Sequence, residues 1–230
     1  MIIQGLQKLT LLDYPGRVAC TVFTAGCNLR CPFCHNAGLV THIDTENRYN
    51  EDEFFAFLRK RKGILDGVCI TGGEPLLQND ITDFIRKIKE LGFAVKLDTN
   101  GCFPEKLKAL IDGKLVDYIA MDIKNTPEKY GETVGIDGFD VTPVLNSIEI
   151  LKNGQVDYEF RTTVVEEYHS ENDFDVIGKI LEGAEKYFLQ QFKDSGDIIG
   201  EGLHAPDKAK MLKMLESTRK FIPSAELRGV

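Results

Sequence analysis

The sequence predicts an α/β protein built around a parallel β-sheet. Short apolar segments alternate six times with amphipathic segments whose apolar residues recur at helical spacing, over a chain of 230 residues. No internal repeat, low-complexity segment or Pro/Ser-rich linker interrupts this order. Strict alternation of strand and helix implies parallel strands joined by right-handed crossovers. A doubly wound open sheet and an incomplete barrel both fit, and either architecture places function at the carboxyl ends of the strands.

Six segments are predicted to be strands because they are short, apolar and rich in β-branched residues. They span residues 17–24, 67–71, 94–99, 116–123, 158–165 and 187–192. A closed (β/α) barrel has about eight strands, so six are too few to close one.

Helices are predicted between these strands. Residues 51–62 begin with acids and end with bases, which suits the helix dipole. Gly92 follows the helix predicted over 79–91, and Pro143 stands in the first turn of the one over 142–153. The other helices are predicted over residues 104–111, 174–185 and 207–221.

Composition and charge restrict the classes of partner. The net charge is −8 and the sequence pI is about 5.1, which argues against a nucleic-acid partner. Residues 1–16 lack the basic and apolar regions of a signal peptide, and no apolar run reaches membrane-spanning length. We therefore expect a single cytoplasmic domain over residues 1–230 that binds neither nucleic acid nor membrane.

Three of the six cysteines lie within one short loop, residues 25–36, directly after the first predicted strand. Cys27, Cys31 and Cys34 form a C-x3-C-x2-C pattern. Thiolates are the usual ligands of iron–sulfur clusters, which normally take about four. Three ligands would leave one iron open, and an open coordination site is where metal chemistry occurs. The alternative is a structural zinc site with His35 as fourth ligand, which the adjacency of Cys34 and His35 disfavours.

Polar or glycine-rich motifs follow the next three predicted strands. Gly72, Gly73 and Glu74 lie in a T-G-G-E-P segment, where paired glycines allow close backbone approach and Glu74 could accept from an ammonium. Two further pairs are Asp98 with Thr99, and Asp122 with Lys124. Each motif also has a structural interpretation: a tight turn at the first two, a solvated ion pair at the third.

Arg161 stands inside the fifth predicted strand, where an arginine requires a carboxylate partner. A salt bridge to Glu74 or Asp122 would place it in the same cavity. The remaining cysteines are predicted to be small core residues and the loop histidines to be solvated: Cys20, Cys69 and Cys102, and His42, His169 and His204.

The cysteine spacing, with Phe33 before the last cysteine, resembles the radical S-adenosylmethionine (SAM) superfamily. The Cys34-His35-Asn36 tail resembles glycyl-radical-enzyme activases such as pyruvate formate-lyase activating enzyme. The stretch from Asp13-Tyr14-Pro15-Gly16-Arg17 to that tail is similar to the anaerobic ribonucleoside-triphosphate reductase activating subgroup. The resemblance covers most of the chain.

This resemblance implies an incomplete parallel (β/α)6 barrel, a [4Fe–4S] cluster on the three cysteines, and reductive cleavage of SAM. It implies that Gly72, Gly73, Glu74, Asp98, Thr99, Asp122, Lys124 and Arg161 bind the cofactor, and that Asp98 and Thr99 help to hold a monovalent cation. No catalytic residue is expected beyond the cluster and cofactor. The implied partners are a glycyl radical enzyme as protein substrate and a flavodoxin or ferredoxin as electron donor.

Three functions are therefore open. The first is an activase, most simply of anaerobic ribonucleoside-triphosphate reductase, with pyruvate formate-lyase or another glycyl radical enzyme as the alternative substrate. The second is a radical enzyme acting on a small molecule, such as a 7-carboxy-7-deazaguanine synthase, which the Cys-His-Asn tail disfavours. The third is a non-catalytic zinc or iron–sulfur interaction module.

Overall fold

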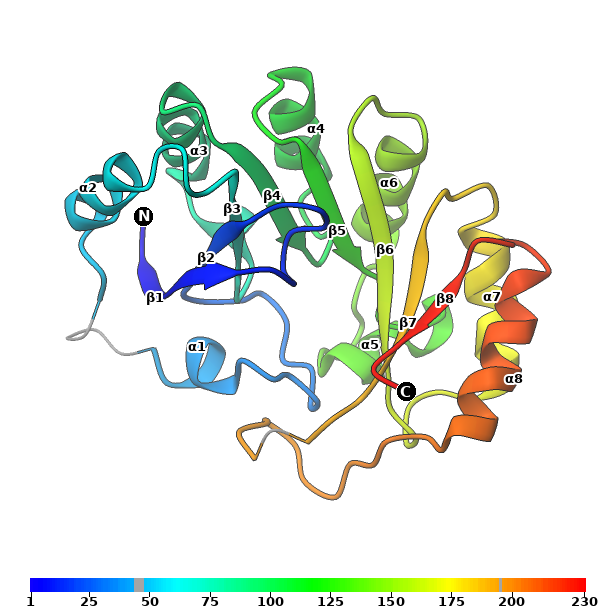
Figure 1. Ribbon diagram of the computed structural model, residues 1–230. Coiled ribbons are helices and arrows are strands. Elements are labelled where there is room, and N and C mark those ends of the chain that lie inside the picture. The colour runs from blue at the N-terminus through cyan, green and yellow to red at the C-terminus, as the bar shows by residue number, and fades with distance from the viewer. Residues whose placement is uncertain (44–47, 195) are drawn as a thin grey trace.

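The computed structural model describes residues 1–43, 48–194 and 196–230. Within these residues the chain forms one eight-stranded sheet whose strand order follows the sequence (Figure 1). Strand β1 is antiparallel to β2, and all later neighbours are parallel. The strands are β1 (Ile3–Thr10), β2 (Ala19–Thr24), β3 (Gly67–Gly72), β4 (Ala94–Thr99), β5 (Tyr118–Asp122), β6 (Asp157–Val164), β7 (Tyr187–Gln191) and β8 (Glu226–Arg228).

The predicted α/β class is confirmed, and the six predicted strands are β2 to β7. The sheet gains two edge strands that the sequence analysis did not predict. Strand β1 is buried only at Ile3 and Thr10, and half-buried or exposed between them, so its apolar pattern is weak. Strand β8 has three residues, which is too short to show a pattern. Both edges of the sheet are thus formed by strands with little apolar signal.

Helices cover the outer side of the sheet. Helix α3 buries Ile81, Phe84, Ile85 and Ile88, which recur at helical spacing and form one apolar face. Among the described residues, no helix is long and apolar enough to cross a membrane. The helices are α1 (Ala37–Thr41), α2 (Glu51–Lys60), α3 (Ile81–Glu90), α4 (Pro104–Asp112), α5 (Tyr130–Val134), α6 (Thr142–Lys152), α7 (Glu171–Ile180) and α8 (Lys208–Arg219), with short 3-10 turns at Pro75–Leu77 and Pro127–Lys129.

The largest boundary error concerns helix α7, predicted over residues 174–185. It begins earlier because Ser170 caps it: the Ser170 N–H and hydroxyl both donate to Asp173 Oδ2, at 2.7 and 2.8 Å. It ends at Ile180, and Gly183 follows with a φ of +84°. Polar residues that looked like a loop therefore start the helix.

The parallel strands end on one side of the molecule, the lower side in Figure 1. The cysteine loop, α1 and α5 lie on that side as well. The loop is fixed to α5 through Arg30, whose backbone N–H donates to Val134 O at 2.9 Å. The functional end predicted from the alternation of strands and helices is therefore also the end that carries the cysteines.

A buried carboxylate attaches the short edge strand β8 to the sheet. Glu159 on β6 is 2% exposed and accepts from Arg228 Nη1 at 2.8 Å and Nη2 at 3.0 Å. It also accepts from the Tyr118 hydroxyl at 2.9 Å. A buried carboxylate that loses its cationic partner is strongly destabilising, so Arg228 carries much of the attachment of β8.

We therefore expect Arg228→Met to lower the free energy of unfolding by roughly 2–3 kcal/mol, because Glu159 keeps only a neutral donor. Denaturant unfolding followed by circular dichroism measures this change. The control is Arg59→Met, at an exposed position of α2, with an expected change of at most about 0.5 kcal/mol. Equal losses in both variants would contradict the assigned role of the Glu159–Arg228 pair.

Candidate functional site

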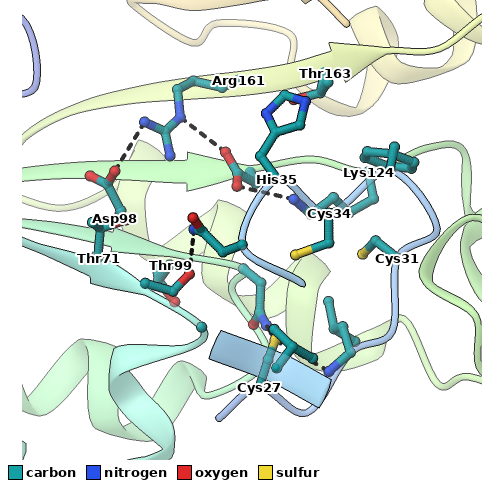
Figure 2. A pocket seen from close by; sticks show the side chains of 18 of the residues that line it. Cys27, Cys31, Cys34, His35, Thr71, Asp98, Thr99, Lys124, Arg161 and Thr163 are labelled. Atoms are coloured by element: carbon teal, nitrogen blue, oxygen red, sulfur yellow. Dashed lines mark hydrogen bonds and ion pairs between the residues drawn. The ribbon is translucent and has the colours of Figure 1, made fainter. Parts of the chain in front are cut away.

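The three cysteines of the loop line one cavity of about 240 Å³, which opens at the carboxyl ends of the strands (Figure 2). Gly26 turns the chain out of β2 with a φ of +84°, a conformation that favours glycine. The Cys34 N–H donates to Cys31 O at 3.0 Å, which closes a turn between these two cysteines. The structure thus brings the predicted metal ligands Cys27, Cys31 and Cys34 together on one wall.

The sulfur environment suits a metal cluster. Cys27 Sγ accepts from the Leu29 N–H at 3.4 Å and from Asn100 Nδ2 at 3.8 Å, and such donors stabilise thiolate ligands of iron–sulfur clusters. Burial raises the pKa of Cys27 and raises the pKa of the Cys31 thiol to about 12. Ionisation of Cys31 therefore requires a nearby cationic centre, as in metal binding coupled to proton release. The donor set fits a [4Fe–4S] cluster.

The paired glycines after β3 pack directly on the cysteine loop. A Cβ at Gly73 would lie 1.9 Å from Gly26 O, so only glycine fits there. The Glu74 N–H donates to Gly26 O at 2.8 Å, and Asn36 Nδ2 donates to Gly72 O at 2.9 Å. Gly72 and Gly73 line the cavity as predicted, with their backbone held against the loop.

Unlike Gly72 and Gly73, Glu74 does not line the cavity. Its carboxylate is fully buried outside the cavity wall and accepts from Leu76 N at 3.0 Å, Thr99 Oγ1 at 2.9 Å and Asn100 N at 2.7 Å. Burial raises the pKa of Glu74 to about 7, while these three donors act in the opposite direction. The observed role of the carboxylate is to join the turns after β3 and β4, and contact with a ligand ammonium stays a prediction.

Five alternating charges cross the strands beside the cavity, and we call them the charged row: Lys96, Asp98, Arg161, Asp122 and Lys124. Arg161 Nη1 lies 3.2 Å from Asp98 Oδ2, and its Nε lies 2.9 Å from Asp122 Oδ1 (Figure 2). Lys124 Nζ lies 3.0 Å from Asp122 Oδ2. Burial alone would raise the pKa of Asp122, but Arg161 and Lys124 lower it to about 2. Asp122 is therefore ionised at neutral pH.

The charged row contains the carboxylate partners that the sequence analysis required for Arg161. Its partners are Asp122, one of the two that were considered, and Asp98, while Glu74 is bonded elsewhere. Asp98, Thr99, Asp122, Lys124 and Arg161 all line the same cavity as the cysteines, and Lys124 lies beside Cys31 and Cys34 (Figure 2). The register of the parallel strands explains this, since Asp122 and Arg161 are direct neighbours on β5 and β6.

Several residues near the cavity were not predicted from the sequence. Lys96 is 2% exposed in the middle of β4, and its only signal was its position two residues before Asp98, on the same face of the strand. Asn100 donates to Asn28 Oδ1 at 2.9 Å, although the sequence assigned it only to a turn. Other unpredicted lining residues are Thr71, Thr163 and Gln190.

The prediction that His169 is solvated is wrong. It is 5% exposed, and its Nδ1 accepts from the Val165 N–H at 3.1 Å. Its Nδ1 also lies 3.2 Å from Val165 O, and its Nε2 lies 2.8 Å from Lys124 O. Burial lowers the pKa of His169, so the ring is neutral and fixes the backbone of Lys124. Cys20 and Cys69 are buried as predicted, while Cys102 is only partly buried.

His35, beside the third cysteine, lies against the end of β7. Its ring stacks on Phe192 with 5.5 Å between ring centroids and 24° between planes. Burial lowers the pKa of His35, which favours its neutral form. His35 lines the cavity together with the cysteines, where its ring would form part of the wall around a ligand.

Comparison with known proteins identifies this architecture. The family model described as the radical SAM superfamily matches residues 21–178. A Methanocaldococcus jannaschii protein named as a glycyl-radical enzyme activating enzyme is 33% identical over 239 residues, which cover 100% of this chain and 96% of the relative. The pyruvate formate-lyase-activating enzyme of Listeria monocytogenes is 35% identical over 141 residues, covering 56% of this chain and 55% of the relative.

A solved structure agrees at the level of the fold. Streptococcus suis SuiB bound to S-adenosylmethionine superposes with a TM-score of 0.67 at 16% identity, covering 90% of this chain and 49% of that one. The family match also decides between the cluster and the zinc site in favour of the cluster. The chain belongs to the radical SAM superfamily and, through its full-length relative, to the glycyl-radical enzyme activating enzymes, so that it is an enzyme whose cofactors are a [4Fe–4S] cluster and S-adenosylmethionine.

Proposed function

We propose that this enzyme generates a glycyl radical on anaerobic ribonucleoside-triphosphate reductase. The observation that carries the activase function is the match along the whole chain to a protein named as a glycyl-radical enzyme activating enzyme. The choice of the reductase is supported by the long stretch from Asp13 to the Cys34-His35-Asn36 tail, which resembles the reductase-activating subgroup, whereas the tail alone supports activases as a class. Flavodoxin or ferredoxin is the proposed electron donor, and the cytoplasm is the proposed location.

We assign the cavity as the cofactor site, with Cys27, Cys31 and Cys34 as the cluster ligands. When bound, the cluster and SAM supply the one-electron chemistry that removes a hydrogen atom from a glycine of the partner. The protein orients the cofactor and excludes side reactions. Gly72 and Gly73 line the cavity and are half-buried, and this turn is the proposed neighbour of the amino-acid moiety of SAM.

The charged row is the proposed site for the polar end of SAM. Asp98, Asp122, Lys124 and Arg161 present both signs of charge to the cavity, which suits a zwitterionic amino-acid group. Their mutual ion pairs hold each side chain in position before the ligand binds, which reduces the ordering cost of binding. Thr99 and Glu74 are the proposed positioning groups beneath this site.

The choice of partner is tested by an electron paramagnetic resonance assay. Reduced enzyme and SAM are incubated side by side with anaerobic ribonucleoside-triphosphate reductase and with pyruvate formate-lyase. We expect the glycyl doublet on the reductase alone, and none with Cys31→Ala, because that variant loses a cluster ligand. A doublet only on pyruvate formate-lyase would refute the proposed partner. SAM cleavage driven by a small purine precursor, with no doublet on either protein, would refute the activase.

The contact of the glycine turn with the cysteine loop is tested by Gly73→Ala. The added Cβ would lie 1.9 Å from Gly26 O, so the loop must move and the cluster content should fall. We expect a loss of roughly 1–3 kcal/mol of stability as well, typical of overpacking. Iron and sulfide analysis measures the cluster. Gly38→Ala in α1 is the control, because its Cβ would meet nothing closer than 3.7 Å. Full cluster content in Gly73→Ala would contradict this role.

A further inference from the structure

Lys96 is a buried cation that the proposed function does not yet use. It lies in the middle of β4, is 2% exposed, and points to the same side of the strand as Asp98. Its Nζ forms an ion pair with Asp98 Oδ1 and lies 3.8 Å from Cys69 Sγ. A buried lysine retains its charge only beside a carboxylate, so Asp98 accounts for its presence there.

Both oxygens of Asp98 already have cationic partners. Oδ1 is paired with Lys96, and Oδ2 accepts from Arg161 Nη1 at 3.2 Å. The Thr99 hydroxyl is engaged too, since it donates to Glu74 Oε1 at 2.9 Å and accepts from the Gly101 N–H at 3.2 Å. The two side chains expected to help hold a monovalent cation therefore have few free lone pairs for one.

The charge of the site agrees with this geometry. The charged row contains three cations (Lys96, Lys124 and Arg161) and two carboxylates (Asp98 and Asp122), which gives a net charge of +1. A further metal cation would meet net positive charge in a partly buried site, where repulsion is poorly screened. An incoming carboxylate, in contrast, would balance the row.

We infer that the ammonium of Lys96 takes the place of a monovalent metal cation at Asp98, so that SAM binding needs neither K⁺ nor Na⁺. This inference rests on the proposed SAM site and replaces the cation expected from family resemblance. Lys96 acts through Asp98 and is therefore a positioning residue. It neutralises the Asp98 carboxylate, so that in the Asp98–Arg161 pair the guanidinium of Arg161 is the charge that faces the cavity.

The test is the SAM affinity of the anaerobic, cluster-bearing enzyme, measured by calorimetry in two buffers of equal ionic strength. One buffer contains K⁺, and the other contains only tetramethylammonium, which is too large for such a site. The wild type should bind equally in both. Lys96→Met should bind roughly tenfold more weakly without K⁺ and recover with it, because Asp98 then requires a replacement cation. The thermal midpoint of this variant should also rise selectively with K⁺.

Two variants exclude a general loss of packing. Lys108→Met removes an exposed lysine that pairs with Asp112, and it should behave as the wild type in both buffers. The double variant Lys96→Met with Asp98→Asn removes the carboxylate that needs compensation, so its thermal midpoint should lose the selective response to K⁺. Persistence of that response would overturn the inference.

The remaining outcomes separate the inference from the proposed function. Weaker SAM binding by the wild type without K⁺ would overturn the inference and leave the proposed function intact. So would a Lys96→Met variant that binds SAM as the wild type does in both buffers. Absence of SAM binding by the cluster-bearing wild type in either buffer would refute the proposed SAM site itself.

Discussion

The close contact between the glycine turn and the cysteine loop determines the arrangement of the site. Gly73 lies so near to Gly26 O that no side chain fits, and the Glu74 N–H bonds the same carbonyl. Asn36 holds the turn from the other side through Gly72 O. Because the turn directly follows β3, these contacts fix the cysteine loop, and with it the three sulfur atoms, relative to the sheet. Together with the hydrogen bond from the Arg30 N–H to Val134 O on α5, these contacts fix the geometry of the loop.

Opposite this contact, electrostatics and sheet register act together. Removing ions from water is costly, and buried ions are tolerated where each one meets an opposite charge. Parallel pairing sets Asp122 beside Arg161, and the two-residue period of a strand sets Lys96 below Asp98. Each charge of the row therefore has an opposite charge as its neighbour before any ligand arrives. His169 extends this fixed arrangement to the backbone of Lys124 without adding charge.

Much of this could be predicted from the sequence, where the signal was local. Alternating apolar segments predicted the strands β2 to β7, and the cysteine spacing singled out the three cysteines that line the cavity. The strand-end motifs pointed to Gly72, Asp98 and Asp122. What failed depends on contacts between distant residues. The burial of His169 requires Lys124, 45 positions away. Lys96 is the exception, because its partner Asp98 is only two residues further on, and its burial results from the packing of β4 within the sheet. Edge strand β8 owes its place to Glu159, 69 positions before Arg228.

Because the sheet follows the order of the chain, the two halves of the site come from different parts of the sequence. The cysteine loop and the glycine turn lie within the first 74 residues, whereas the charged row is complete only at Arg161 on β6. During synthesis, all three thiols are therefore part of the chain before Asp122 and Arg161 are added. The two walls of one cavity are thus separate in synthesis order.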